Sequence, residues 1–181
     1  MGVEIEKKYR LTDEQFSAVQ EALAEFGAEY VGEDFEENSI YGGGALDERR
    51  AILRIRRTAG KTFLTFKERI DNDLAIKHQT EHETAVDDAA ELARIVEALG
   101  FEVRVVYEKR RKTWKFRSVE VVLDELPFGR FMEIEGTVMT IAEAEMLLGA
   151  EEFEAVHESY PALTWNLGQR KGNRVEARFG P

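Results

Sequence analysis

Charged side chains occupy one whole face of several predicted strands, and this pattern constrains the fold more than any other feature of the chain. Side chains alternate between the two faces of a strand, so the first strand places Glu4, Glu6 and Lys8 on one face and Ile5 and Tyr9 on the other. Pairs of charges with the same spacing recur later as Arg54 and Arg56, Lys67 and Arg69, Glu81 and Glu83, Lys109 and Arg111, and Glu133 and Glu135. Such a sheet is either solvated on its charged face or wrapped around a charged cavity.

Apolar periodicity separates the helices from the strands. The capping-box residues Thr12 and Gln15 precede an apolar stripe with helical spacing, which predicts a helix that stops at Gly27. Two further helices are predicted, one from about residue 87 to 100 and one from about 140 to 149. Strands are predicted at residues 3–10, 35–41, 52–57, 63–69, 79–86, 103–112, 114–124 and 130–136. This order predicts an α+β fold: an eight-stranded antiparallel barrel with a charged interior, covered on its apolar outer face by amphipathic helices.

Length and composition limit the class of protein. The chain has 181 residues and 43% apolar composition, which is typical of one domain with a full core. We expect residues 1–167 to form that domain, while residues 168–181 form a basic tail whose order the sequence leaves open. No run of 18 apolar residues predicts a membrane span. The net charge of -11 argues against nucleic acid as a ligand, because phosphate-backbone binders need a broad basic surface.

Cysteine usage and the start of the chain bear on its location. The absence of cysteine excludes disulfides and thiolate metal sites and is consistent with a cytoplasmic protein. The first predicted strand begins at Val3, which leaves no room for a signal peptide. We expect a cytoplasmic monomer or homodimer that does not interact with a membrane.

If the charged faces line one interior, acidic and basic side chains share it. The acidic set is Glu4, Glu6, Glu81, Glu83, Asp124, Glu133 and Glu135, and the basic set is Lys8, Arg54, Arg56, Lys67, Arg69, Lys109 and Arg111. Glu120 has the same parity as Asp124 but lies nearer the start of its strand, so it is a weaker candidate. Buried charges of one sign alone would cost several kcal/mol each, whereas a wet cavity that holds both signs and a ligand avoids most of that cost.

These residue types indicate metal and phosphate chemistry. Carboxylates two residues apart on a strand are roughly 6–7 Å apart, which can accommodate a divalent cation between neighbouring strands. Oxygen ligands without cysteine favour Mg²⁺ or Mn²⁺ over zinc. Arginine and lysine suit phosphate oxygens, and so many basic groups fit a triphosphate better than a monophosphate. The combination is typical of phosphoryl or nucleotidyl transfer.

The segment Glu4-Ile5-Glu6-Lys7-Lys8 resembles the ExExK signature of the CYTH family, also called triphosphate tunnel metalloenzymes. That family includes class IV adenylate cyclases and thiamine and inorganic triphosphatases. The resemblance extends from residue 3 to about 160 through Leu53-Arg54-Ile55-Arg56, Leu64-Thr65-Phe66-Lys67, Glu81-His82-Glu83, Lys109-Arg110-Arg111, Leu123-Asp124-Glu125 and Phe131-Met132-Glu133-Ile134-Glu135-Gly136. The layout is most similar to the bacterial class IV adenylate cyclase-like group, although the aromatic stretch that often precedes ExExK in those cyclases is missing here.

The resemblance implies roles for individual residues. It implies a tunnel in an eight-stranded barrel, with metal held by Glu4, Glu6, Glu133 and Glu135 and assisted by Asp124, and with phosphates held by Lys8, Arg54, Arg56, Lys67, Lys109 and Arg111. By their place on the charged face, Glu81 and Glu83 join the metal candidates and Arg69 joins the phosphate candidates. Glu4, Glu6 and Lys8 are the candidates for catalysis.

The leading hypothesis is an enzyme that depends on Mg²⁺ or Mn²⁺ and converts ATP into cyclic AMP and pyrophosphate. The alternative enzyme is a triphosphatase that hydrolyses tripolyphosphate, thiamine triphosphate or a nucleoside triphosphate. A non-catalytic module that binds polyphosphate or nucleotides is a third reading, which the many carboxylates disfavour because anion binding alone does not need them. The fourth is a β-rich scaffold with its charged faces in water.

Overall fold

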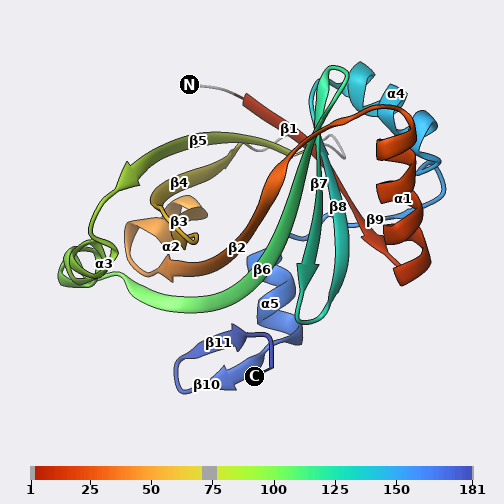
Figure 1. Cartoon of the computed structure of the whole chain (residues 1–181). Helices are drawn as coiled ribbons and strands as arrows, with labels where there is room; N and C mark the ends of the chain where they lie inside the picture. Colours follow the sequence, from red (N-terminus) through yellow and green to blue (C-terminus); the bar gives the residue numbers. More distant parts are fainter. Residues whose placement is uncertain (1–2, 71–76, 181) are drawn as a thin grey trace.

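One large sheet and five helices make up the molecule (Figure 1). The computed structural model describes residues 3–70 and 77–180. The strands are β1 (Val3–Leu11), β2 (Glu29–Gly42), β3 (Ala51–Arg57), β4 (Thr62–Ile70), β5 (Lys77–Val86), β6 (Glu102–Phe116), β7 (Val119–Leu126), β8 (Gly129–Glu135), β9 (Glu154–Ala155), β10 (Gln169–Lys171) and β11 (Arg174–Ala177). The helices are α1 (Asp13–Glu25), α2 (Ala45–Arg49), α3 (Ala89–Ala98), α4 (Val138–Leu148) and α5 (Tyr160–Leu167).

The strands pair in the order β10-β11-β6-β2-β3-β4-β5-β1-β8-β7. Neighbours among β1–β8 are antiparallel, and β6 pairs with β7 as well as with β2. The short strand β9 pairs with β1, and β11 runs parallel to β6. The predicted α+β class and antiparallel sheet are confirmed. The described residues contain eleven strands rather than the predicted eight. Strands β9, β10 and β11 were not predicted because they are too short to show an alternating pattern.

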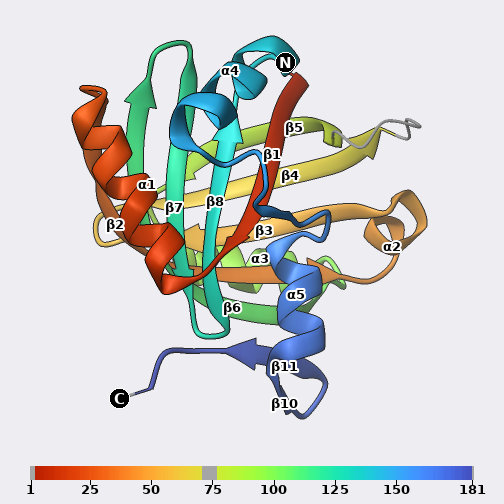
Figure 2. The same ribbon diagram turned by 90° about the vertical axis from the view of Figure 1, so that its right-hand side faces the viewer.

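Helices cover the apolar outer face of the sheet. In Figure 2, α1 and α4 lie against the face formed by β1, β7 and β8. Their apolar side chains join those of the strands in one core that includes Val19, Leu23, Ile141, Leu148, Tyr9, Val121, Met132 and Ile134. Helix α3 covers β3 and β4 in a second core that includes Leu92, Val96, Ile55 and Leu64. Since successive side chains point to opposite faces, this cover leaves the charged residues of these strands on the inner face.

Several predicted boundaries are wrong: β2, predicted from residue 35, begins at Glu29. Two of the differences have local reasons. Strand β6 continues beyond Lys112 because Trp114 and Phe116 are buried in the first core, and the turn into β7 falls at Arg117, where φ is 53°. Helix α4 begins after Thr137, whose hydroxyl accepts from the backbone N–H of Thr140 while the Thr140 hydroxyl accepts from the backbone N–H of Thr137. The capping box at the start of α1 is confirmed.

The C-terminal segment contains β10 and β11, which extend the sheet beside β6. Arg178 fixes this segment through ion pairs with Glu37 at 2.6 Å, Glu108 at 2.8 Å and Glu176 at 3.2 Å. Sequence reasoning missed the contacts with Glu37 and Glu108 because they join residues far apart in the chain. Among the described residues, no helix is long and apolar enough to cross a membrane.

Candidate active site

A cavity of about 350 Å³ is lined by residues from each of the strands β1–β8 and from the start of α5. Twelve of its lining residues are charged, six acidic and six basic: Glu6, Glu81, Glu83, Glu120, Glu133, Glu135, Lys8, Arg54, Arg56, Lys67, Lys109 and Arg111. The uncharged lining includes Ile40, Ile52, Tyr107, Val122 and Pro161. The described charged faces therefore meet around one hollow that also has an apolar part.

Lys8 and Glu133 form the buried centre of one wall. They face each other in the ladder between β1 and β8, with 3.2 Å between Lys8 Nζ and Glu133 Oε1. Lys8 also donates to the backbone carbonyl of Glu158 at 3.2 Å and lies 4.0 Å from the centre of the Tyr160 ring. Burial by itself would raise the pKa of Glu133, but Lys8 and Arg111 hold that pKa below its usual range. Glu133 is therefore ionised at neutral pH.

Asp124 lies behind the lining and is fully buried. It accepts two hydrogen bonds from Arg111, at 2.8 and 2.6 Å, and one from the Tyr160 hydroxyl at 2.7 Å. Lys109 Nζ is 3.5 Å away from the same carboxylate. Burial and the neighbouring carboxylate of Asp124 raise the pKa of Tyr160, so its hydroxyl keeps its proton and acts as a donor. Asp124 thus orients two cations towards the cavity.

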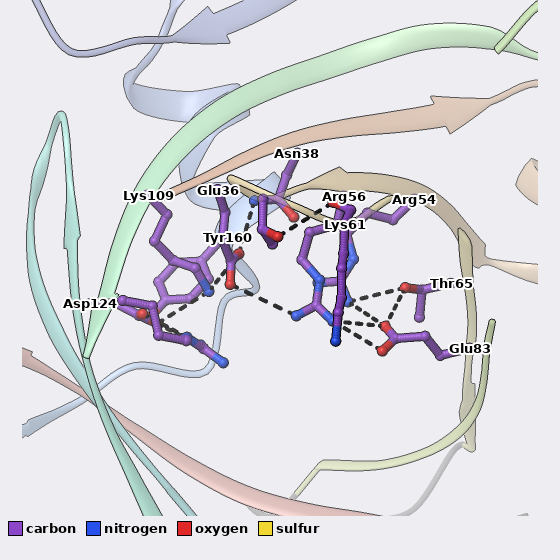
Figure 3. Close-up of polar contacts among 12 residues, drawn as sticks. Glu36, Asn38, Arg54, Arg56, Lys61, Thr65, Glu83, Lys109, Asp124 and Tyr160 are labelled. Carbon is purple, nitrogen blue, oxygen red and sulfur yellow. Dashed lines mark hydrogen bonds and ion pairs between the residues drawn. The ribbon is translucent and has the colours of Figure 1, made fainter. Parts of the chain in front are cut away.

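A second group surrounds Arg56 (Figure 3). Arg56 Nη2 donates to both oxygens of Glu83, at 3.0 and 3.1 Å. Thr65 donates to Glu83 at 2.7 Å and accepts from Arg54 at 3.3 Å. The Nε atoms of Arg54 and Arg56 are buried and have no hydrogen-bond partner among the described residues. Both guanidinium groups therefore keep an unused donor.

Carboxylates also occupy facing positions on three neighbouring strands. Glu6 on β1 faces Glu135 on β8, which in turn faces Glu120 on β7. All three line the cavity. Facing residues have Cβ atoms about 5 Å apart, and like charges at such positions are unfavourable unless a cation lies between them. In the described part of the chain, no three carboxylate or histidine side chains lie close enough together to hold a metal ion.

Glu36 on β2 is a site residue that sequence reasoning missed. Its carboxylate is 3.3 Å from Lys109 Nζ and 3.8 Å from Arg56 Nη1, and it accepts a hydrogen bond from Asn38 at 3.2 Å. Burial would raise its pKa, but Lys109, Arg111 and Arg56 lower the value to about 2. The available signal was the alternation of Glu36 and Asn38, but the predicted strand at residues 35–41 has no second charge on that face to form the recurring pair.

Tyr160 was also missed, because it belongs to α5 rather than to a strand. Ser159 caps this helix by accepting from the backbone N–H of Ala162, and Pro161 occupies its first turn, so the local sequence fixes where the helix begins. The first residue, Tyr160, is thereby directed at Lys8 and Lys109.

The predicted site residues divide into three groups. The lining includes Glu6, Lys8, Arg54, Arg56, Lys67, Glu81, Glu83, Lys109, Arg111, Glu133 and Glu135. Lys67 and Glu81 form an ion pair of 2.6 Å there. Asp124 lies behind the lining, whereas Glu120, the weaker candidate, is part of it. The side chains of Glu4 and Arg69 lie outside the described residues.

Comparisons with known proteins agree with this fold. The sequence model of the CYTH domain matches residues 2–162. The PH1012 protein from Pyrococcus horikoshii OT3 is 26% identical and superposes with a TM-score of 0.77 over 88% of this chain and 98% of that one. A conserved hypothetical protein from Pyrococcus furiosus is 25% identical, with a TM-score of 0.77 over 88% and 99% of the two chains. A Hippeastrum protein described as having a dominant triphosphatase activity has the same fold at 20% identity and a TM-score of 0.68, over 90% and 95%. No curated protein matches the chain.

Proposed function

Because this chain belongs to the CYTH domain family, we propose that it is a divalent-cation-dependent enzyme that acts on a triphosphate-bearing substrate in the charged cavity. The observation that carries the proposal is the lining itself, in which six acidic and six basic side chains surround a hollow of about 350 Å³. A scaffold with solvated charged faces has no reason to gather both signs around one hollow.

We further propose that β1–β8 form the wall of a tunnel. Each of these eight strands pairs with two others of the same set, and each contributes to the lining. A wall of this kind holds its side chains on rigid strands, which suits a reaction that depends on positioning and on charge stabilisation.

The balance of charges supports a requirement for cations. The lining is close to neutral before any ligand binds, because the six basic side chains are matched by six carboxylates. A triphosphate adds several negative charges, which are unfavourable in a cavity partly shielded from water unless cations accompany it. Mg²⁺ and Mn²⁺ suit the carboxylate ligands.

The carboxylates of Glu6, Glu135 and Glu120 fit such a cation, since they face one another on adjacent strands and line the cavity. When bound, the cation would offset charge on the phosphoryl oxygens and orient the triphosphate. Glu133, Glu81, Glu83 and Glu4 remain further candidates. Asp124 fits this role poorly, because Arg111, Lys109 and Tyr160 surround its oxygens.

Lys8, Lys109 and the arginines of the lining fit the phosphate oxygens. The unused Nε donors of Arg54 and Arg56 support this role, because a phosphate oxygen could accept from a guanidinium that shifts by a rotamer. Lys67, Arg111 and Arg69 complete the proposed phosphate-binding set.

An organic group on the triphosphate is favoured by the apolar part of the lining, which includes Ile40, Ile52 and Val122. The proposed substrate is therefore ATP. In the cyclase reaction the ribose 3′-oxygen attacks the α-phosphorus, the bond to the bridging oxygen breaks, and pyrophosphate leaves with that oxygen. The 3′-hydroxyl proton passes to a carboxylate, for which Glu6 is the candidate, while Lys8 and the arginines stabilise charge on the leaving group.

Hydrolysis is the second candidate, and the exposure of the lining favours it. Glu83, Glu120 and Glu135 are exposed, so water reaches the cavity. With ATP as the substrate, water would attack the γ-phosphorus, the bond to the β–γ bridging oxygen would break, and ADP and phosphate would be released.

Phosphorus NMR of the products tests the proposal. ATP, tripolyphosphate and thiamine triphosphate are each incubated with the protein and Mg²⁺ or Mn²⁺. Cyclic AMP with pyrophosphate would identify the cyclase, and release of terminal phosphate would identify the triphosphatase. Tight binding of the three compounds without any product would favour the non-catalytic binding module instead of an enzyme.

A further inference from the structure

Neighbouring residues Glu36 and Glu37 point to opposite faces of β2 and have different surroundings. Glu36 is on the inner face and only 3% exposed, and it does not line the cavity. Glu37 is on the outer face, where it pairs with Arg57 at 3.2 Å and Arg178 at 2.6 Å. Each carboxylate therefore neutralises two cations, but only Glu36 contacts cations of the proposed phosphate-binding set.

Glu36 contacts Lys109 and Arg56 from behind the lining. The distances are 3.3 Å to Lys109 Nζ and 3.8 Å to Arg56 Nη1, and Figure 3 shows its carboxylate between these two side chains. Lys109 and Arg56 come from β6 and β3, which flank β2 on either side. Glu36 thus connects cations from the two strands that flank its own.

The contact belongs to a longer series of alternating charges. From Glu36 the series continues through Lys109 to Asp124, which is 3.5 Å from Lys109 Nζ. Arg111 Nη2 is 2.6 Å from Asp124 and also 2.6 Å from Glu133. Glu133 in turn is 3.2 Å from Lys8 Nζ. Both ends of the series, Arg56 and Lys8, line the cavity.

We infer that Glu36 is a positioning residue, which holds Lys109 and Arg56 in the places where they meet the phosphates. The inference rests on the proposed function. Glu36 is not among the residues that line the cavity, so it would act on a ligand through Lys109 and Arg56. Long cationic side chains lose much rotamer freedom when they are fixed, and an ionised carboxylate between two of them removes that freedom before the ligand arrives.

A charge-removing variant separates positioning from net charge. Glu36→Gln takes one negative charge out of the wall, and by electrostatics alone this would strengthen the binding of an anion. Loss of positioning acts in the opposite direction. The sign of the change in tripolyphosphate affinity therefore reports which effect dominates.

The experiment is calorimetric titration of tripolyphosphate with Mg²⁺ into the full chain and its variants. We expect Glu36→Gln to raise Kd at least tenfold and to raise KM for the preferred substrate more than it lowers kcat. The matched control Glu37→Gln removes a carboxylate from the same strand with the same number of cationic partners, and its Kd should stay within about twofold of wild type. Circular dichroism checks that both variants are folded.

If Glu36→Gln does not fold, Glu36→Asp keeps the charge and shortens its reach by one methylene group. We expect this variant also to weaken binding, because the carboxylate can no longer contact both cations. An unchanged or lower Kd in the folded variant would overturn the inference and leave the proposed function intact. Absence of tripolyphosphate binding by the wild-type protein would overturn both.

Discussion

Lys8 Nζ lies 3.2 Å from Glu133 Oε1, and the two side chains face each other across β1 and β8 inside the sheet. The Lys8 side chain is 3% exposed and that of Glu133 is 11% exposed, so neither charge can turn to bulk water. The pair therefore joins the first strand to the last strand of the eight that line the cavity.

Substitution of Lys8 by methionine should destabilise the fold. The variant leaves the buried Glu133 carboxylate with Arg111 as its remaining close cation, at 2.6 Å. Removing one member of a buried ion pair costs about 3 kcal/mol, reduced here to about 2 kcal/mol by the second cation. Urea unfolding measures the difference, and an unfolding free energy equal to that of the wild type would contradict this role.

Arg56→Ala should lower the turnover of the preferred triphosphate by two or more orders of magnitude while the fold stays intact. Arg56 lines the cavity, whereas its neighbour Arg57 points outwards and pairs with Glu37. Arg57→Ala is therefore the matched control and should retain nearly full turnover. Equal rates in the two variants would remove Arg56 from the proposed phosphate-binding set.

Glu6→Gln should also lower turnover by two or more orders of magnitude, and it should weaken the binding of Mn²⁺. The reason is that Glu6 faces Glu135 at the proposed cation site. Electron paramagnetic resonance of free Mn²⁺ measures the affinity independently of activity. Wild-type Mn²⁺ affinity and wild-type turnover in this variant would exclude both roles.

Acid stability should depend on Glu36. Its pKa is about 2 in the folded protein because Lys109, Arg111 and Arg56 outweigh the effect of burial. A carboxylate whose pKa is lowered by folding stabilises the folded state above its unfolded pKa of about 4.3, and this contribution disappears as the pH falls towards the folded pKa. Between these values the unfolding free energy should fall more steeply with acidification in the wild type than in Glu36→Gln. Parallel curves would show that folding does not lower the pKa of Glu36.

Arg178→Ala should lower the stability of the C-terminal strands without affecting the cavity. Arg178 pairs with Glu37, Glu108 and Glu176, of which Glu176 is buried. Loss of the cation should cost about 1 kcal/mol, since the surroundings are partly exposed. Hydrogen exchange should accelerate in β10 and β11, and unchanged exchange there would show that other contacts fix this segment.

Much of this arrangement follows from the sequence because alternation with period two is local. The parity of Glu6 and Lys8 on β1, and of Arg54 and Arg56 on β3, is enough to predict that they share one face with the other charged pairs. The capping box at Thr12 is equally local. The α+β class depends on such signals and could be predicted.

The remainder depends on contacts between distant residues. Glu36 has no second charge on the same face of the predicted strand at residues 35–41, and its importance arises from Lys109, which lies far later in the chain. The predicted metal-assisting role of Asp124 rested on the resemblance alone. In the structure Arg111 and Tyr160 donate to that carboxylate, and the position of Tyr160 depends on how α5 packs onto the sheet. Short elements such as β10 leave too few residues for a pattern.

The most direct test of the central claim is a crystal structure of the protein with Mn²⁺ and tripolyphosphate, with anomalous diffraction at the manganese edge. The account predicts a triphosphate inside the cavity in contact with Arg54, Arg56 and Lys109, and manganese peaks beside Glu6 and Glu135. Triphosphate bound only on the outer surface, or a cavity that stays free of both phosphate and manganese at saturating concentrations, would contradict it.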